Sequence, residues 1–227
     1  KYARFSGAAY KINSLNWNCG SICTNADTQG TNVVYHWNKG GVKPSFGYVA
    51  LKSNTKEIIV AYRGSETAMD WVTDARVVQK AWPSAVKNSH VHSGFLDAYS
   101  SDAANIKKAV LGLVNSNPTF TIVITGHSLG GAEATLAAAD FSLSYPDWKS
   151  KIALYTYGSP RAGNPEFASW VSSQPFPIFR VTYKGDPVPR IPLRSENFRH
   201  VTQEVYYPKS GGLKFCGDVA ESNKCID

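Results

Sequence analysis

The chain has 227 residues, of which 43% are hydrophobic and 18% charged, a composition typical of a globular protein with a sizeable buried core. Its formal net charge of +7 comes from Lys and Arg residues that form no run and accompany no nucleic-acid-binding motif, so we expect no nucleic-acid partner. No apolar run is as long as a membrane span, which predicts the absence of a transmembrane segment. Because no hydrophobic leader follows Lys1, we expect a processed or trimmed chain.

The four cysteines form two local pairs by their spacing, Cys19 with Cys23 and Cys216 with Cys225. Each pair encloses a short loop that is polar or contains glycine, which favours local disulfides made in an oxidising compartment. A zinc site built from the four thiolates is the alternative, but the Cys-x3-Cys spacing and the wide second pair match structural zinc sites poorly. We therefore expect two disulfides and no metal.

The first sixty residues predict a helix and then strands. Ala8–Leu15 is moderately apolar and predicts a helix, whereas Asn32–Trp37 and Ser45–Leu51 have the β-branched and aromatic content of strands. Lys39-Gly-Gly-Val-Lys-Pro44 is a turn sequence, so we expect these two strands to form a hairpin. Glu57–Tyr62 is a continuous apolar run, as expected for a strand that is buried on both faces.

The residues that follow this run are candidates for a reaction site. Ser65 comes after Arg63-Gly64, just past the predicted central strand, where its N–H and hydroxyl can reach a developing oxyanion. The alternative for Ser65 is an ordinary turn serine. The next short segment carries bulky apolar side chains and is either a lid over the site or a packed helix. It consists of Met69, Asp70, Trp71 and Val72.

His90 and His92 alternate with Val91, an arrangement that can place two metal ligands on one face of a strand. No third ligand cluster accompanies them, so hydrogen-bonded structural histidines are the better interpretation. A helix is expected from about Asp102 to Val114, where apolar residues recur at helical spacing.

Residues 121–143 contain the clearest chemical signal in the chain. The β-branched run Ile122–Ile124 leads into Gly126-x-Ser128-x-Gly130, and Ala132–Leu143 is rich in helix formers without Gly or Pro. A serine on a sharp turn between a strand and a helix is a nucleophile elbow, which exposes Oγ at the N-terminus of the helix. The Leu129 N–H is then the first donor to an oxyanion. The alternative is a chance match, since Gly-x-Ser-x-Gly also occurs in loops.

Three more strands follow the elbow, at Lys151–Tyr157, Pro177–Tyr183 and Val201–Tyr207. Strands that alternate with helices predict an α/β fold with a mostly parallel sheet and reactive groups at the carboxyl ends of its strands. Asp186 lies just past one strand, and the chain order serine, acid, histidine favours it as the acid of a triad. An ordinary turn aspartate before Pro187 is the alternative.

Several sequence blocks together resemble the fungal class 3 lipases, a family that includes feruloyl esterases and mono- and diacylglycerol lipases. The resemblance spans nearly the whole chain and implies one α/β-hydrolase domain over residues 1–227, with helices on both faces of the sheet. It also implies Ser128 as nucleophile, Asp186 as acid, the Ser65 and Leu129 amides as oxyanion hole, a lid around Trp71, and a Cys216–Cys225 disulfide. The blocks are Ala61-Tyr-Arg-Gly-Ser65, Asp70-Trp-Val-Thr-Asp74, Val91-His-Ser-Gly-Phe95, Thr125-Gly-His-Ser-Leu-Gly-Gly131, Tyr157-Gly-Ser-Pro-Arg-Ala-Gly-Asn164 and Asp186-Pro-Val-Pro-Arg-Ile-Pro192.

The catalytic histidine is where the chain departs from this family. His200 is the only histidine after Asp186, and chain order alone favours it as the base. The family, however, has a non-catalytic histidine at this place, and its catalytic histidine lies beyond the cysteine pair. We therefore expect the base to lie beyond Asp227 and the sequence to lack a short C-terminal segment.

These observations predict a secreted carboxylic ester hydrolase, most closely a triacylglycerol lipase, that forms an acyl-enzyme on Ser128 and binds transiently to lipid–water interfaces. We expect a monomer without a cofactor. A feruloyl or other carboxylesterase is the nearest alternative, and the apolar Trp71 segment favours the lipase. A catalytically dead lipase-like protein that binds lipid or glycan is the alternative from another class.

Overall fold

The computed structural model describes residues 1–41, 44–65, 78–217, 221 and 225. Its helices are α1 Tyr2–Ala8, α2 Ser21–Thr24, α4 Ser93–Ser100, α5 Ala103–Ser116, α6 Leu129–Ser144 and α7 Pro165–Ser172. Its strands are β1 Asn32–Lys39, β2 Ser45–Lys52, β3 Glu57–Tyr62, β4 Gln79–Ala81, β5 His90–His92, β6 Thr121–His127, β7 Ile152–Tyr157, β8 Ile178–Tyr183, β9 Glu204–Tyr207 and β10 Lys214–Phe215. Short 3-10 turns occur at Ser53–Thr55, Pro146–Trp148, Val188–Arg190 and Arg194–Glu196.

One sheet organises the chain, with the strand order β1-β2-β3-β6-β7-β8-β9-β10. The five strands from β3 to β9 in this order pair in parallel, and the antiparallel strands β1, β2 and β10 lie at the two edges. The predicted mostly parallel sheet and the predicted β1–β2 hairpin are therefore confirmed. Crossovers place every parallel strand in the same direction, so their carboxyl ends meet at one edge of the sheet.

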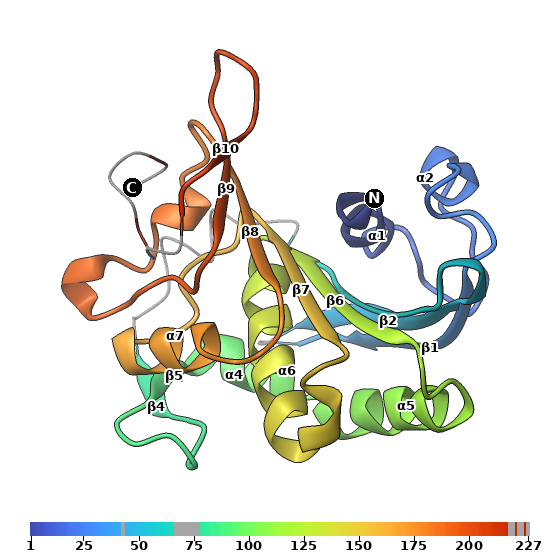
Figure 1. The fold of residues 1–227 in the computed structure, drawn as a ribbon, viewed down its shortest axis with the longest axis horizontal. Coiled ribbons are helices and arrows are strands. Elements are labelled where there is room, and N and C mark those ends of the chain that lie inside the picture. The colour runs from blue at the N-terminus through green and yellow to red at the C-terminus, as the bar shows by residue number, and fades with distance from the viewer. Residues whose placement is uncertain (42–43, 66–77, 218–220, 222–224, 226–227) are drawn as a thin grey trace.

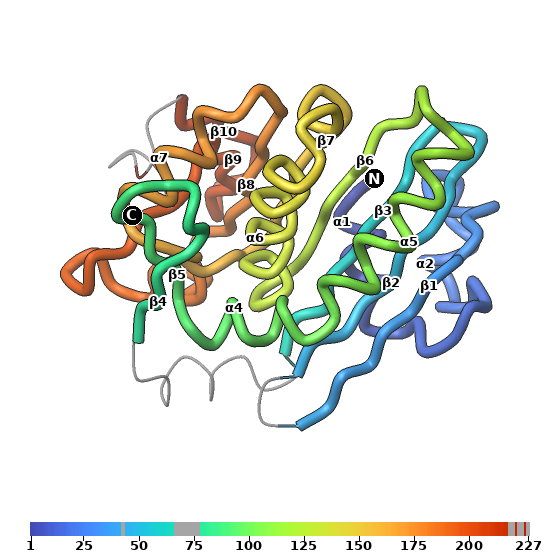
Figure 2. Tube along the Cα trace, turned by 90° about the horizontal axis from the view of Figure 1, so that it is seen from below, coloured from blue at the N-terminus to red at the C-terminus, as the bar shows by residue number. Residues whose placement is uncertain are grey.

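Helices cover both faces of this sheet (Figure 1). The helices α4, α5, α6 and α7 lie on one face, and Figure 2 shows α4, α5 and α6 crossing it. The helices α1 and α2 lie on the other face. Alternate residues of β3 face the two helical layers. Ile58 and Val60 pack in the apolar cluster that contains α6, whereas Ile59 and Ala61 pack in the cluster that contains α1. Burial on both faces explains why this strand has a continuous apolar sequence.

The N-terminal helix lies earlier in the chain than predicted. It spans Tyr2–Ala8, where Phe5 and Ala8 are fully buried against the sheet, so the expected helix over Ala8–Leu15 is wrong. Asn13 and Ser14 favour turns rather than helix, which explains why no helix forms over the second half of the predicted range. The buried face, and not the local apolar content, determines where α1 lies.

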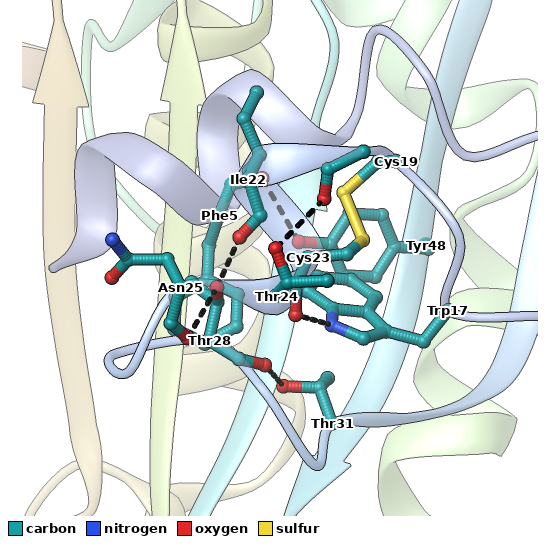
Figure 3. The surroundings of a disulfide bond; sticks show 11 residues. Phe5, Trp17, Cys19, Ile22, Cys23, Thr24, Asn25, Thr28, Thr31 and Tyr48 are labelled. Carbon is teal, nitrogen blue, oxygen red and sulfur yellow. Dashed lines mark hydrogen bonds between the residues drawn. A yellow bond between two sulfur atoms is a disulfide. The ribbon is translucent and has the colours of Figure 1, made fainter.

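Both cysteine pairs form disulfides, Cys19–Cys23 and Cys216–Cys225, which leaves no free thiol for the alternative zinc site. The first disulfide joins Cys19 to Cys23 of α2, close to Trp17 and Tyr48 (Figure 3). There the Trp17 indole donates a hydrogen bond to the Cys23 carbonyl, and the Tyr48 hydroxyl donates to the Phe5 carbonyl. The first of these hydrogen bonds ties α2 to the loop that precedes it, and the second ties β2 to α1. In the described part of the chain, no helix has both the length and the apolar character needed to span a bilayer.

Candidate active site

The residues predicted to react lie along one edge of the sheet, because the parallel register aligns the strand ends. Tyr62 at the end of β3 pairs with Gly126 of β6, and His127 pairs with Tyr157 at the end of β7. Ser65 therefore follows β3 and Ser128 follows β6 at the same edge. Asp186 comes just past β8, on the far side of β7.

Ser128 has the backbone geometry of a nucleophile elbow. Its φ of 56° and ψ of −129° are strained for a residue with a side chain, and such strain concentrates at functional sites. The two flanking glycines are required by close packing. A Cβ on Gly126 would lie 2.0 Å from the Gly130 carbonyl oxygen, and one on Gly130 would lie 2.5 Å from the Tyr62 carbonyl oxygen. The tight turn between β6 and α6 is therefore built around Ser128.

The two residues predicted to form an oxyanion hole lie at the start of α6 and just after β3. Leu129 is the first residue of α6, so its N–H has no carbonyl partner within the helix, and the helix dipole favours an anion there. Ser65 lines an open, mostly apolar cleft of about 530 Å³ together with His127 and Tyr157. Because His127 directly precedes Ser128, the cleft lies beside the elbow.

Tyr10 joins the two sides of this site, which the sequence did not reveal. Its hydroxyl accepts a hydrogen bond from the Gly64 N–H at 3.1 Å and lies 2.7 Å from Nδ1 of His127. The residues before Ser65 and before Ser128 are thus linked through one side chain from the segment after α1.

The Asp186 carboxylate is oriented by its own segment. Its Oδ1 accepts a hydrogen bond from the Val188 N–H at 2.9 Å. Its Oδ2 faces Gly158, where a Cβ would lie only 2.7 Å away, and Gly158 has a positive φ of 55°. The carboxylate therefore lies beside the residue that follows β7, between the ends of β6 and β8.

None of the five histidine rings, all within the described ranges, hydrogen-bonds to the Ser128 hydroxyl or to Asp186. The His200 ring is buried, and its Nε2 lies 2.6 Å from the Pro189 carbonyl oxygen. Burial and the neighbouring Arg180 and Arg161 hold the pKa of His200 well below its usual range, so the ring is neutral and donates this bond. This placement does not support His200 as the base.

His90 and His92 have separate structural partners. Nδ1 of His90 lies 2.8 Å from the Asn88 carbonyl oxygen, and Nδ1 of His92 accepts from the Phe95 N–H at the start of α4. Burial lowers the pKa of His92 to about 4, which keeps the ring neutral and able to accept. Their placement supports the structural interpretation. The predicted lid residues Met69, Asp70, Trp71 and Val72 lie outside the described residues.

Comparison with known proteins places this geometry in a family. Residues 59–196 match the family described as Lipase (class 3). The chain belongs to the class 3 lipase family. It is 44% identical over 187 residues to secreted mono- and diacylglycerol lipase 1 of Fusarium solani, covering 82% of this chain and 54% of that protein. It is 34% identical over 185 residues to secreted mono- and diacylglycerol lipase A of Penicillium cyclopium, covering 81% of this chain and 59% of that protein.

Solved structures of this family share the fold. A Rhizomucor miehei lipase in complex with its propeptide superposes with a TM-score of 0.92 at 29% identity, over 99% of this chain and 73% of that one. A triacylglycerol lipase whose catalytic centre is described as a serine protease triad superposes with a TM-score of 0.91 at 29% identity, over 99% of this chain and 85% of that one. The expected α/β-hydrolase fold is therefore confirmed. The chain spans only a little more than half the length of the two curated relatives.

This lipase-family chain also carries a buried acid directly behind the elbow. Glu133 lies one turn past Ser128 on α6 and is fully buried; its Oε2 accepts a hydrogen bond from the Ser45 hydroxyl. Among the residues that the structure describes, its Oε1 has no hydrogen-bond partner, and neither does the buried hydroxyl of Tyr62. Burial raises the pKa of Glu133 to about 8, so the carboxyl group is neutral at mildly acidic pH.

The buried Glu133 predicts a loss of stability toward alkaline pH. Because its folded-state pKa of about 8 lies above the unfolded value of 4.5, its contribution is complete below pH 4.5 and is lost as pH rises toward 8. The loss is at most about 1.4 kcal/mol per pH unit. Glu133→Gln should remove this part of the slope when the free energy of unfolding is measured by urea titration from pH 4.5 to 9. An unchanged slope in the variant would contradict the buried neutral acid.

Proposed function

We propose that the protein is a secreted serine ester hydrolase that acts on acylglycerol esters. The observation that carries the proposal is the strained Ser128, placed at one sheet edge with Ser65 and Asp186. Two relatives are named as secreted mono- and diacylglycerol lipases, and another family member as a triacylglycerol lipase, which supports the substrate class. The two disulfides support secretion. The shared sheet from Asn32 to Phe215 supports one α/β-hydrolase domain, and we propose that it acts as a monomer.

In this mechanism Ser128 Oγ attacks the ester carbonyl carbon as a base removes its proton. The negative charge that develops on the carbonyl oxygen is stabilised by the N–H groups of Ser65 and Leu129. Collapse of the tetrahedral intermediate breaks the bond to the alcohol oxygen, which leaves with the proton from the base. Water then attacks the acyl carbonyl carbon as the base removes its proton. Ser128 Oγ leaves with that proton, and the fatty acid is released.

We propose that the base is a histidine beyond Asp227, oriented by the Asp186 carboxylate. The family resemblance favours this position, and the buried ring of His200, bonded to Pro189, supports it. Asp186 lies near the elbow with Oδ1 engaged by Val188, which leaves Oδ2 to hold an imidazole in the right tautomer.

Two alternatives differ from this proposal in substrate or in chemistry. A feruloyl or other carboxylesterase would use the same Ser128 on a different acyl group. A lipid- or glycan-binding protein would retain the cleft beside Ser65 without turnover. The mostly apolar lining of that cleft favours a lipid ligand over a glycan.

Replacing the nucleophile tests the enzyme proposal. Ser128→Ala should lower ester turnover by roughly 10⁴-fold or more, because no acyl-enzyme can form. The melting temperature should change little, since the elbow backbone is retained. Hydrolysis of p-nitrophenyl butyrate and of a dispersed diacylglycerol measures both substrate classes. Ser116→Ala, on α5, is the control and should keep full activity; substantial turnover by Ser128→Ala would rule out the mechanism.

The C-terminus of the native protein distinguishes the enzyme from the binding protein. Mass spectrometry of the secreted chain should find sequence beyond Asp227 that contains a histidine, and replacing that histidine with Ala should abolish turnover. A native chain that ends at Asp227 would favour the binding protein.

From the sequence we also propose that Met69, Trp71 and Val72 form an apolar cover that responds to lipid surfaces. Activity on a short-chain triacylglycerol should then rise sharply above its solubility limit, where an interface forms. Trp71→Ser should reduce that rise more than it reduces the rate on the dissolved ester. Rates that increase smoothly through the solubility limit would argue against a cover.

A further inference from the structure

The segment that carries Asp186 is held from outside at four successive carbonyl groups, those of residues 189 to 192. The Arg161 guanidinium donates from Nη1 to two of them, at 2.6 Å and 3.0 Å, and the Arg161 backbone N–H donates to a third at 2.8 Å. The neutral ring of His200 donates to the fourth at 2.6 Å. The Nη1 bonds go to the carbonyls of Arg190 and Pro192, and the backbone bond goes to that of Ile191. His200 bonds the carbonyl of Pro189.

Arg161 can serve this segment because its own charge is compensated. Its side chain is 3% exposed, and its Nε donates to Glu221 Oε1 at 2.6 Å. A buried guanidinium without such a partner would be strongly destabilising. Glu221 also accepts from the His200 N–H at 2.9 Å and lies 3.0 Å from Arg194 Nε. Glu221 therefore joins both groups that hold the segment.

Glu221 belongs to the loop that the Cys216–Cys225 disulfide closes. This bond limits how far Glu221 can move from the end of β10. A chain of contacts thus runs from Glu221 through Arg161 to residues 190–192.

At its N-terminal end, this segment orients the Asp186 carboxylate. Val188 N–H holds Asp186 Oδ1 at 2.9 Å, and Gly158, three residues before Arg161, faces Oδ2. A shift of the segment relative to Arg161 would therefore move the carboxylate relative to the elbow. A displacement of about 1 Å at a catalytic group can cost about 10²-fold in rate.

We propose that Arg161 is a positioning residue for Asp186. Glu221 is the counter-ion of Arg161, and the Cys216–Cys225 disulfide limits the movement of Glu221. The inference rests on the proposed function for its kinetic consequence. Arg161 does not touch the reacting atoms; it acts through the peptide groups of the acid segment.

A second buried ion pair provides a matched control. Arg180 on β8 is 1% exposed and lies 3.3 Å from Glu204 on β9, and its Nε donates to the Val201 carbonyl. These contacts stay within the β8–β9 region and do not involve residues 189–192. Arg180→Lys therefore perturbs an arginine of similar burial without removing any of the four bonds to residues 189–192.

The test compares Arg161→Lys with Arg180→Lys in the secreted enzyme. Both variants should lower the melting temperature. Only Arg161→Lys should speed amide hydrogen exchange in the peptide that covers residues 186–193, by about tenfold or more, because lysine cannot bind Glu221 through one nitrogen and the two carbonyls through another. Only Arg161→Lys should lower kcat, by about 10- to 100-fold with KM nearly unchanged. The acidic limb of its kcat/KM profile should shift to lower pH, since a misplaced carboxylate stabilises the protonated base less.

Glu221→Gln and the double variant Cys216→Ser/Cys225→Ser serve if Arg161→Lys does not fold, and both should change exchange and kcat in the same direction. Unchanged exchange in residues 186–193 in every variant that folds would overturn the inference, whatever the kinetics. Equal kinetic losses in Arg161→Lys and Arg180→Lys would also overturn it, because both would then reflect stability alone. Absence of ester turnover in the unmodified protein would refute the proposed function, and the exchange comparison would still decide whether Arg161 holds the segment.

Discussion

The positive φ of Ser128 is the constraint on which the reactive edge depends. The turn from β6 into α6 closes only because Gly126 and Gly130 let backbone atoms approach within distances that a Cβ would forbid. This closure puts the serine at the sheet edge and places the start of α6, with the Leu129 N–H, beside it. The burial of α6 on nearly all sides holds Ser128 in its strained conformation, because the helix cannot shift without disrupting the core.

Local features of the site could be predicted from the sequence, whereas features that depend on distant segments could not. The turn at Ser128 and the strand end before Asp186 are encoded by neighbouring residues, so their patterns are visible in the chain. Arg161 is different, since its partners Arg190, Pro192 and Glu221 lie 29, 31 and 60 residues away. The place of α1 was mispredicted for a similar reason: Phe5 is fixed by packing against the sheet, which no local pattern of the chain describes.

The interior behind the site combines two different ways of burying ionisable groups. The charges of Arg161 and Arg180 are compensated by carboxylates within hydrogen-bond distance. Glu133 has a hydroxyl and no cation as its bonded partner, so the favourable state is the neutral acid. His200 likewise stays neutral beside two arginines, which makes it a hydrogen-bond donor to the acid segment. Ionic pairs thus fix the acid side of the site, whereas neutral groups pack behind the serine.

The position of Tyr10 makes the amino-terminal segment part of the reactive edge. Phe5 and Ala8 cover one face of the central strands, and Lys1 and Tyr2 bind Glu57 at the start of β3. Tyr10 then bonds Gly64 at the end of the same strand. Residues 1–10 therefore contact β3 near both of its ends. Proteolytic removal of the first ten residues would both expose an apolar sheet face and release the peptide that precedes Ser65, so under the proposed function cleavage near the amino terminus would inactivate the enzyme.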